Sequence, residues 1–241
     1  MAGLERITIL TQSARLVRRT FAGLWAQDCL LCGGPAADRP LCTACEDDLP
    51  RLPSPRCARC GLPIPGDGLC GRCLVKAPNF DSTHAAYVYD FPVDRLVQSF
   101  KYGHRLMLGK YFGRQLVELA SGLTFERIIP LPLHPLRLRQ RGFNQALELA
   151  RPISRASGVP LDTRSCQRSR ATVAQAELPW RERARNVRGA FACTTDLTGQ
   201  RVLLVDDVMT TGASVDELAR TVKLHGASEV TVLVLARALP R

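Results

Sequence analysis

The chain has 241 residues, of which 46% are hydrophobic and 23% are charged, a balance typical of a folded protein and not of a disordered one. The 33 Lys and Arg residues outnumber the 22 Asp and Glu residues, and the net charge of +11 favours anionic partners such as phosphates or nucleic acid. Arginine-rich codon usage would produce the same excess. No segment approaches the roughly 20 apolar residues of a membrane span and no signal-peptide pattern is present, so we expect a cytoplasmic protein without a transmembrane segment.

The first expected element is an amphipathic helix within residues 1–27. Apolar residues recur there at spacings of three and four, which is the period of a helix with one apolar face. They are Ile7, Leu10, Ala14, Val17, Phe21 and Leu24. Docking of this face on the rest of the chain is the simpler interpretation, and binding to a membrane surface or a partner protein is the alternative.

Residues 28–77 hold eight of the ten cysteines, arranged as four C-x-x-C pairs. The pairs form two copies of one motif, in which nine residues separate the first pair from the second. Each cysteine of the second copy lies 28 positions after its counterpart in the first. The cysteines are Cys29, Cys32, Cys42, Cys45, Cys57, Cys60, Cys70 and Cys73. Two such pairs supply four thiolates, the ligand set of a tetrahedral structural zinc site. The motif therefore predicts a double zinc ribbon with two Zn²⁺ ions.

Other chemistries also use paired cysteines, and an iron–sulfur cluster is the closest alternative. A disulfide framework needs an oxidising compartment, and a thioredoxin-like site needs one C-x-x-C pair at the start of a helix. A region of about 50 residues with few large apolar side chains also needs the folding free energy that zinc supplies, on the order of 10 kcal/mol per ion. Neighbouring pairs are the simplest ligand sets, and a crossed arrangement of the pairs stays open.

From residue 80 onward, strand and helix patterns alternate. Continuous apolar runs predict strands at 85–91, 127–133, 201–207 and 229–238. Helical signals predict helices at 93–103, 106–120, 141–157 and 213–227. This order is typical of an α/β domain with a parallel sheet, here expected over residues 80–241. Ligands of such domains bind beyond the carboxyl ends of the strands.

The sequence VLLVDDVMTTGAS, residues 202–214, lies where such a ligand would bind. After the strand, main-chain N–H groups and hydroxyl groups can form a cradle for one phosphate, made of Thr210, Thr211, Gly212, Ala213 and Ser214. Asp206 and Asp207 alternate across an extended strand, so each can face a different part of a sugar, and a ribose diol with Mg²⁺ suits both carboxylates. The stretch is predicted to hold a ribose 5-phosphate. An Asp pair that only caps the next helix is the structural alternative.

This stretch resembles the phosphoribosyl diphosphate (PRPP) binding motif of type I phosphoribosyltransferases. The order of segments, with paired cysteines, then IIPLPLHPLRLRQRGFNQA, then QAELPWRERARNVRGAF, then the PRPP motif, resembles the ComF family, which includes competence proteins of DNA uptake. The resemblance covers nearly the whole chain from Cys29 onward. It implies a parallel-sheet, type I phosphoribosyltransferase-like domain preceded by a double zinc ribbon. It also implies that Asp206 and Asp207 meet the ribose hydroxyls and serve catalysis, while residues 210–214 bind the 5-phosphate.

Two basic segments lie between the zinc ribbon and the PRPP motif. The first follows the strand at 127–133 in a proline-stiffened loop, and its cationic side chains suit a pyrophosphate: His134, Arg137, Arg139 and Arg141. A solvated basic helix start is the alternative. The second, residues 164–188, would be a mobile hood over the site by resemblance. It could equally be a track for single-stranded DNA, with Trp180 or Phe143 available for base stacking.

Three functions follow from the resemblance, and the sequence leaves enzymatic activity open. The first is binding of PRPP with Mg²⁺ and phosphoribosyl transfer, linked to DNA uptake or nucleotide metabolism. Purine-salvage enzymes usually carry an acidic residue where Thr210 stands and orotate enzymes carry Thr, so the resemblance disfavours purine salvage. The second is a competence protein without transfer activity, in contact with single-stranded DNA or another competence protein. The third is a PRPP-sensing regulator.

Overall fold

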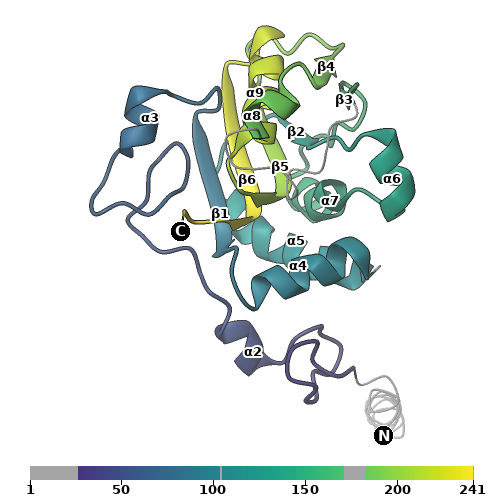
Figure 1. Cartoon of the computed structure of the whole chain (residues 1–241). Helices are drawn as coiled ribbons and strands as arrows, with labels where there is room; N and C mark the ends of the chain where they lie inside the picture. Colours follow the sequence, from purple (N-terminus) through teal and green to yellow (C-terminus); the bar gives the residue numbers. More distant parts are fainter. Residues whose placement is uncertain (1–26, 104, 171–182, 241) are drawn as a thin grey trace, which may run out of the picture. The chain divides into compact units, whose positions relative to one another are not determined.

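The computed structural model describes residues 27–103, 105–170 and 183–240 (Figure 1). Contacts divide the chain into two units, Met1–Leu49 and Pro50–Arg241. The helix expected within residues 1–27 lies outside the described residues except for Gln27. The domain limits predicted from sequence patterns, 28–77 and 80–241, stay predictions, and the division by contacts falls between the two cysteine motifs.

The two cysteine motifs fold in the same way. In each, a short helix begins directly after the third of the four cysteines. Cys42 is the N-cap of α2 (Thr43–Asp47), and Cys70 is the N-cap of α3 (Gly71–Val75). In each, an isolated antiparallel bridge closes the first knuckle, between Asp28 and Pro35 in one copy and between Arg56 and Pro63 in the other. The repeat in the sequence is therefore a repeat in the backbone.

A four-stranded parallel sheet forms the centre of the larger unit, with the strand order β1-β6-β5-β2 (Figure 1). Its strands are β1 (Ser82–Val88), β2 (Arg127–Pro130), β5 (Arg201–Met209) and β6 (Glu229–Arg237). The central strands β5 and β6 are almost wholly buried, which explains their continuous apolar runs. The predicted α/β fold with a parallel sheet is confirmed.

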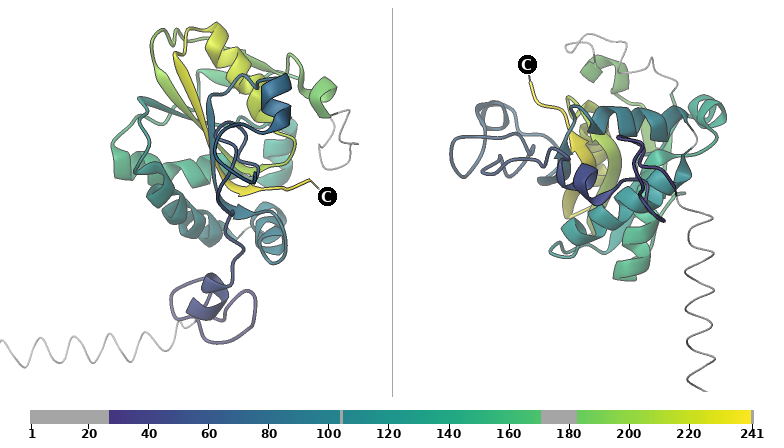
Figure 2. Two further views of the ribbon diagram at one scale, coloured as in Figure 1. Left: turned by 90° about the vertical axis from the view of Figure 1, so that its left-hand side faces the viewer. Right: turned by 90° about the horizontal axis from the view of Figure 1, so that it is seen from below.

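Helices cover both faces of this sheet (Figure 2). On one face lie α5 (Leu106–Ala120) and α7 (Gln145–Ser157). The helix α4 (Val93–Tyr102) comes before α5 in the chain and contacts it. On the other, α9 (Ala213–Leu224) packs its apolar residues against those of β5 and β6. Within the described ranges, no helix has both the length and the apolar composition that crossing a membrane requires.

Four short elements in the described part of the chain were not predicted from the sequence. The predicted helix 141–157 corresponds to α7, and a separate short helix, α6 (Pro135–Arg141), precedes it and ends at Gly142, which adopts a left-handed conformation with φ of 76°. The strands β3 (Cys166–Arg168) and β4 (Phe191–Cys193) pair antiparallel, and α8 (Arg183–Val187) precedes β4. Elements of three to five residues are too short to produce a readable period in the sequence.

Candidate functional site

The cysteines converge in two groups, and each group has the dimensions of a zinc site. The groups are Cys29, Cys32, Cys42 and Cys45, and Cys57, Cys60, Cys70 and Cys73, and the four Sγ atoms of each lie within 4.8 Å of one another. A tetrahedron with Zn–S bonds of about 2.3 Å has edges of about 3.8 Å. The Sγ atoms of Cys32 and Cys42 are 3.8 Å apart, and those of Cys60 and Cys70 are 3.5 Å apart. The residues therefore fit Zn²⁺, with neighbouring pairs as ligands.

Main-chain N–H groups of the knuckles stabilise the thiolate form that binds metal. The Cys70 N–H donates to Cys57 Sγ at 3.3 Å, and the Gly34 N–H donates to Cys32 Sγ at 3.4 Å. Burial by itself raises the pKa of Cys57, but main-chain hydrogen bonds from the knuckle lower it to about 6. Burial likewise raises the pKa of Cys29 in the first group, but main-chain hydrogen bonds lower it to about 6, whereas hydrogen bonding to Cys42 and burial raise the pKa of Cys45 to about 12.

Apart from the two cysteine groups, a further candidate site lies at the carboxyl end of β5, where Asp206 and Asp207 supply two carboxylates. Asp207 is 7% exposed, and its Oδ2 lies 3.0 Å from Nζ of Lys101, which comes from the last turn of α4. Asp206 is half-buried, and its Oδ1 accepts a hydrogen bond of 2.8 Å from the Asp207 N–H. Lys101 was not among the predicted site residues, because only the fold brings the end of α4 to the end of β5.

The charge balance of this pair favours a further cation. Burial and the negative charge of Asp207 raise the pKa of Asp206 to about 7, although Lys101 opposes the shift. Burial alone would lower the pKa of Lys101, but the charge of Asp207 and the hydrogen bond to it raise it. The charges of Lys101 and Arg168 therefore do not fully offset the effects of burial and of Asp207 on Asp206. A hard divalent cation such as Mg²⁺ suits these oxygen ligands.

Arginines from two other elements face the Asp pair. Arg168 of β3 is 6% exposed and lies over the Phe191 ring, with its guanidinium carbon 5.5 Å from the ring centroid. Burial, followed by the charge of Arg137, lowers the pKa of Arg168 to about 10, whereas the charge of Asp206 acts in the opposite direction. Arg141 also acts on this guanidinium. The structure thus brings Arg137 and Arg141 into electrostatic range of Arg168, and Arg168 into range of Asp206, whereas Arg168 was not among the residues predicted on the pyrophosphate side.

The other residues of the first basic segment have different places. His134 is the N-cap of α6, where its Nδ1 accepts a hydrogen bond of 3.3 Å from the Leu136 N–H. Arg139 is exposed on α6, whereas Arg141 donates to Gln145 Oε1 at 3.1 Å. The basic residues from Arg137 to Arg141 therefore lie on a short helix that begins at Pro135, in agreement with the helix start that was the alternative interpretation of this segment.

The loop between β5 and α9 has the form of an anion cradle. Gly212 adopts φ of 85° and is the N-cap of α9, and a Cβ atom there would lie 2.7 Å from Met209 Cε. The Ala213 N–H donates to Thr211 Oγ1 at 3.1 Å, which holds the turn. The loop residues 208–215, apart from Thr211, line a small hollow together with Asp206. Four of the five predicted phosphate residues and one of the two carboxylates thus share one hollow.

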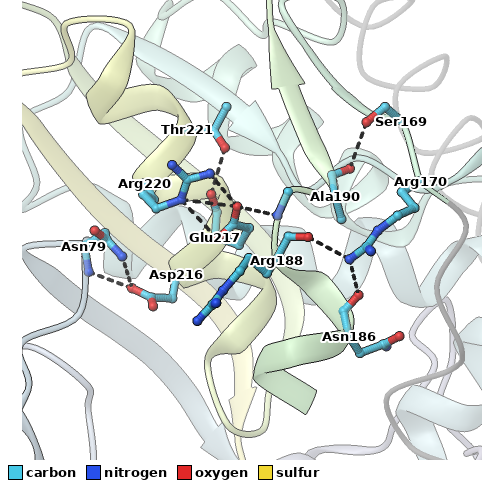
Figure 3. A network of polar contacts seen from close by, with 11 residues as sticks. Asn79, Ser169, Arg170, Asn186, Arg188, Ala190, Asp216, Glu217, Arg220 and Thr221 are labelled. Atoms are coloured by element: carbon cyan, nitrogen blue, oxygen red, sulfur yellow. Dashed lines mark hydrogen bonds and ion pairs between the residues drawn. The ribbon is translucent and has the colours of Figure 1, made fainter. Parts of the chain in front are cut away.

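Two adjacent carboxylates hold the first turns of α9 from both sides (Figure 3). Asp216 accepts hydrogen bonds from the main-chain N–H and the side-chain amide of Asn79, at 2.6 and 3.0 Å. Glu217 accepts the Gly189 N–H at 2.8 Å and an N–H of Arg220 at 2.6 Å. These contacts attach the helix that begins at the cradle to the chain that leaves the second ribbon and to the turn before β4.

The second basic segment, the Arg-rich residues 164–188, is described only in part. Residues 171–182, which include Trp180 and Arg181, lie outside the described residues. Arg170 donates to the main-chain oxygens of Asn186 and Arg188, at 3.0 and 2.6 Å, so the two described ends of the segment are joined (Figure 3).

Comparisons with known proteins agree with both parts of this arrangement. Residues 21–74 match the double zinc ribbon domain, and residues 143–240 match the phosphoribosyl transferase domain. The DNA utilization protein YhgH of Escherichia coli (strain K12) is 34% identical over 221 residues, which cover 88% of this chain and 97% of that protein. Competence protein F of Haemophilus influenzae is 30% identical, covering 87% and 96%. Competence protein ComFC of Streptococcus pneumoniae is 25% identical, covering 83% and 89%.

Proposed function

Since the chain belongs to the ComF family, we propose that its phosphoribosyltransferase-type domain binds PRPP together with Mg²⁺. The observation that carries this proposal is the hollow in which the anion cradle and Asp206 meet at the carboxyl end of β5. A phosphate and a ribose need these two groups of donors and acceptors at neighbouring positions. A simple helix cap would not need two adjacent carboxylates, one of them buried, before the cradle.

Each part of the ligand has its own residues in this proposal. The N–H groups and hydroxyls of residues 210–214 bind the 5-phosphate, and Asp206 and Asp207 accept hydrogen bonds from the ribose hydroxyls. Arg137, Arg141 and Arg168 neutralise the pyrophosphate through forked donors. Mg²⁺ held near the Asp pair would add positive charge to the same oxygens. Lys101 forms an ion pair with Asp207 and orients its carboxylate.

Phosphoribosyl transfer is the reaction that this arrangement supports. The bond between C1 of the ribose and the pyrophosphate oxygen breaks, both electrons leave with the pyrophosphate, and an acceptor nucleophile forms the new bond to C1. The arginines stabilise the negative charge that grows on the leaving oxygen. Release of pyrophosphate with candidate acceptors measures this step separately from binding.

Calorimetric titration with PRPP in the presence of Mg²⁺ tests the binding proposal. PRPP should bind more tightly than ribose 5-phosphate or pyrophosphate alone, because it occupies both halves of the site. The Asp206→Asn variant should weaken PRPP binding by about 2 kcal/mol, roughly 30-fold, through loss of a charge-assisted hydrogen bond, while inorganic phosphate still binds. The Arg155→Ala variant, at an exposed position of α7, is the matched control. Equal affinity of Asp206→Asn and wild type would refute the proposal.

Handling of single-stranded DNA is the second candidate function. The relatives named for competence and DNA utilization support it, as does the net charge of +11. Arg185 and Arg188 are exposed near the described end of the Arg-rich segment. If they contact phosphates, the affinity for a labelled oligonucleotide should fall with salt, with a logarithmic slope of about −0.7 per phosphate neutralised. Changing both to Ala should flatten the slope, whereas Arg155→Ala should not. Lack of binding at low salt would eliminate this function.

A further inference from the structure

The two cysteine groups repeat in sequence but differ in their surroundings. Gly33 and Gly61 occupy equivalent positions, 28 residues apart, with φ of 71° and 69°. A Cβ atom on Gly33 would meet nothing within 4 Å, whereas one on Gly61 would lie 3.3 Å from Thr83 Cγ2 in β1. The Thr83 N–H also donates to the Ala58 main-chain oxygen. The second ribbon is therefore packed on the sheet of the larger unit, to which it belongs by contacts.

Arg237, the last residue of β6, joins this second ribbon to the phosphate cradle. Its side chain is fully buried, with 1% exposure. Its Nε donates to the main-chain oxygen of Cys60 at 2.9 Å. Its Nη1 donates to the main-chain oxygens of Met209, at 2.9 Å, and of Thr210. One guanidinium thus connects a predicted zinc ligand to the two residues that open the cradle.

The partners of Arg237 are unusual for a buried charge. Four of its hydrogen bonds go to main-chain carbonyls, the fourth being that of Ala238 at 2.9 Å, and the Cys60 side chain is a further partner. A buried cation held by carbonyl dipoles and by the sulfur of a zinc-ligand residue depends on the position of each partner, because a lost hydrogen bond leaves the charge poorly solvated. The carbonyl of Cys60 is placed by the knuckle, and the knuckle is placed by its metal.

A pocket lies between the second ribbon and the cradle. It has a volume of about 600 Å³ and is lined by Cys60 and Cys73 from the ribbon and by Met209, Thr211 and Gly212 from the cradle region. Arg237 lines the same pocket. Its hydrogen bonds therefore cross a space that side chains leave partly open, in addition to the contacts of Thr83 with the ribbon and of Asn79 with α9.

We propose that Arg237 is a positioning residue for the phosphate cradle and that metal in the second cysteine group keeps it in place, while metal in the first group does not. The carbonyls of Met209 and Thr210 fix the peptide planes from which the cradle N–H groups project. When the second group loses its metal, the Cys60 carbonyl is released, Arg237 shifts, and the cradle loses its ordered form. The effect on PRPP rests on the proposed function, whereas the effect on the cradle does not.

Two matched variants test this inference. Cys70→Ser and Cys42→Ser each remove the ligand that caps the short helix of one copy. Metal analysis should find one zinc fewer in both. Cys70→Ser should weaken PRPP binding by about tenfold or more and speed amide hydrogen exchange in residues 209–214, because the cradle loses a charged hydrogen-bond partner. Cys42→Ser should change both by less than about twofold. Equal effects of the two variants would overturn the inference.

Further measurements separate the inference from the proposed function and from simple unfolding. If wild-type protein does not bind PRPP, the proposed function fails, and faster exchange of residues 209–214 in Cys70→Ser alone still supports the coupling. Exchange in the centre of β5 and β6 should stay slow, since a general loss of fold would speed both. If Cys70→Ser does not fold, stepwise removal of zinc from wild-type protein replaces it, and cradle exchange should rise with the loss of the second group's metal. Arg237→Lys should reproduce the cradle exchange with both zinc ions retained, and a cradle unchanged in that variant would overturn the inference.

Discussion

Asp206 is the residue whose ionisation matters most at the candidate site. Its pKa is raised to about 7 by burial and by Asp207, so its ionised form is costly until a cation arrives. Asp207 differs because it faces Lys101 at 3.0 Å. Two adjacent residues of one type thus have different electrostatic roles. Their alternation across the strand was predictable, but Lys101 lies more than one hundred residues away in the chain, and its contact was not.

The affinity for PRPP with Mg²⁺ should depend on the ionisation of Asp206. Binding of the cation stabilises the ionised carboxylate and lowers its pKa below the ligand-free value of about 7. The affinity is then highest above pH 7 and falls by up to about tenfold per unit as the pH drops below 7. Calorimetry from about pH 6 to about pH 8 measures this slope. In Asp206→Asn, only the titration of the ligand's own phosphates can change the affinity with pH. If the affinity of this variant falls with pH as steeply as that of wild type, the pH dependence does not come from Asp206.

The two Asp→Asn variants should differ in stability. Asp207→Asn removes the charge opposite the buried Lys101 and should lower the free energy of unfolding by about 3 kcal/mol, as expected for breaking a buried ion pair. Asp206→Asn removes a repulsive charge and should leave that free energy unchanged or higher at about pH 8. Urea unfolding of both variants at this pH makes the comparison. A loss in Asp206→Asn equal to that in Asp207→Asn would show that the ion pair does not distinguish the two residues.

At the scale of elements, α9 connects the cradle to its surroundings through Asp216 and Glu217. Burial alone would raise the pKa of Glu217, but hydrogen bonds from Arg220 and Gly189 lower it. A carboxyl whose pKa is lowered by folding stabilises the fold at pH values above its pKa in the unfolded chain, which is about 4.3 for Glu. This contribution is lost as the pH falls through the pKa of the folded protein. α9 is therefore held most firmly near neutral pH.

Replacing Glu217 should show this contribution directly. Glu217→Gln should lower the free energy of unfolding by about 1–2 kcal/mol at neutral pH, because the buried hydrogen bonds to Gly189 and Arg220 weaken. The difference from wild type should shrink below about pH 4. Glu118→Gln, at an exposed position of α5, should change stability by less than about 0.5 kcal/mol. A pH-independent difference for Glu217→Gln would contradict the role of its charge.

Long elements were predictable from their periods, and short ones were not. The strands predicted at 201–207 and 229–238 correspond closely to β5 and β6, since buried parallel strands are apolar throughout. The predicted helix 106–120 coincides with α5. By contrast, β3 has three residues, and its Arg168 was identified only as one of many arginines in a basic segment. Its burial beside Asp206 depends on pairing with β4, which no local pattern encodes.

At the scale of the whole molecule, the two metal sites should differ in accessibility. Cys32 is exposed in the first group, whereas Cys57, Cys60 and Cys73 of the second are buried. Purified, reduced protein should contain two zinc ions per chain, and a chromogenic chelator should remove them in two phases. The Cys42→Ser variant should lack the fast phase. A single phase for both ions in wild-type protein would contradict the difference in burial.

The unequal packing of the two ribbons also bears on how this sequence can change over time. A duplicated segment starts with two copies under the same demands, and each copy then drifts within the limits set by its neighbours. Gly61 is confined by Thr83, and the carbonyl of Cys60 is committed to Arg237, while the equivalent Gly33 has open space around it. Substitutions, insertions and even replacement by an unrelated module should therefore be tolerated more readily in the first copy. By its contacts, the second copy is part of the larger unit, whereas the first copy is not.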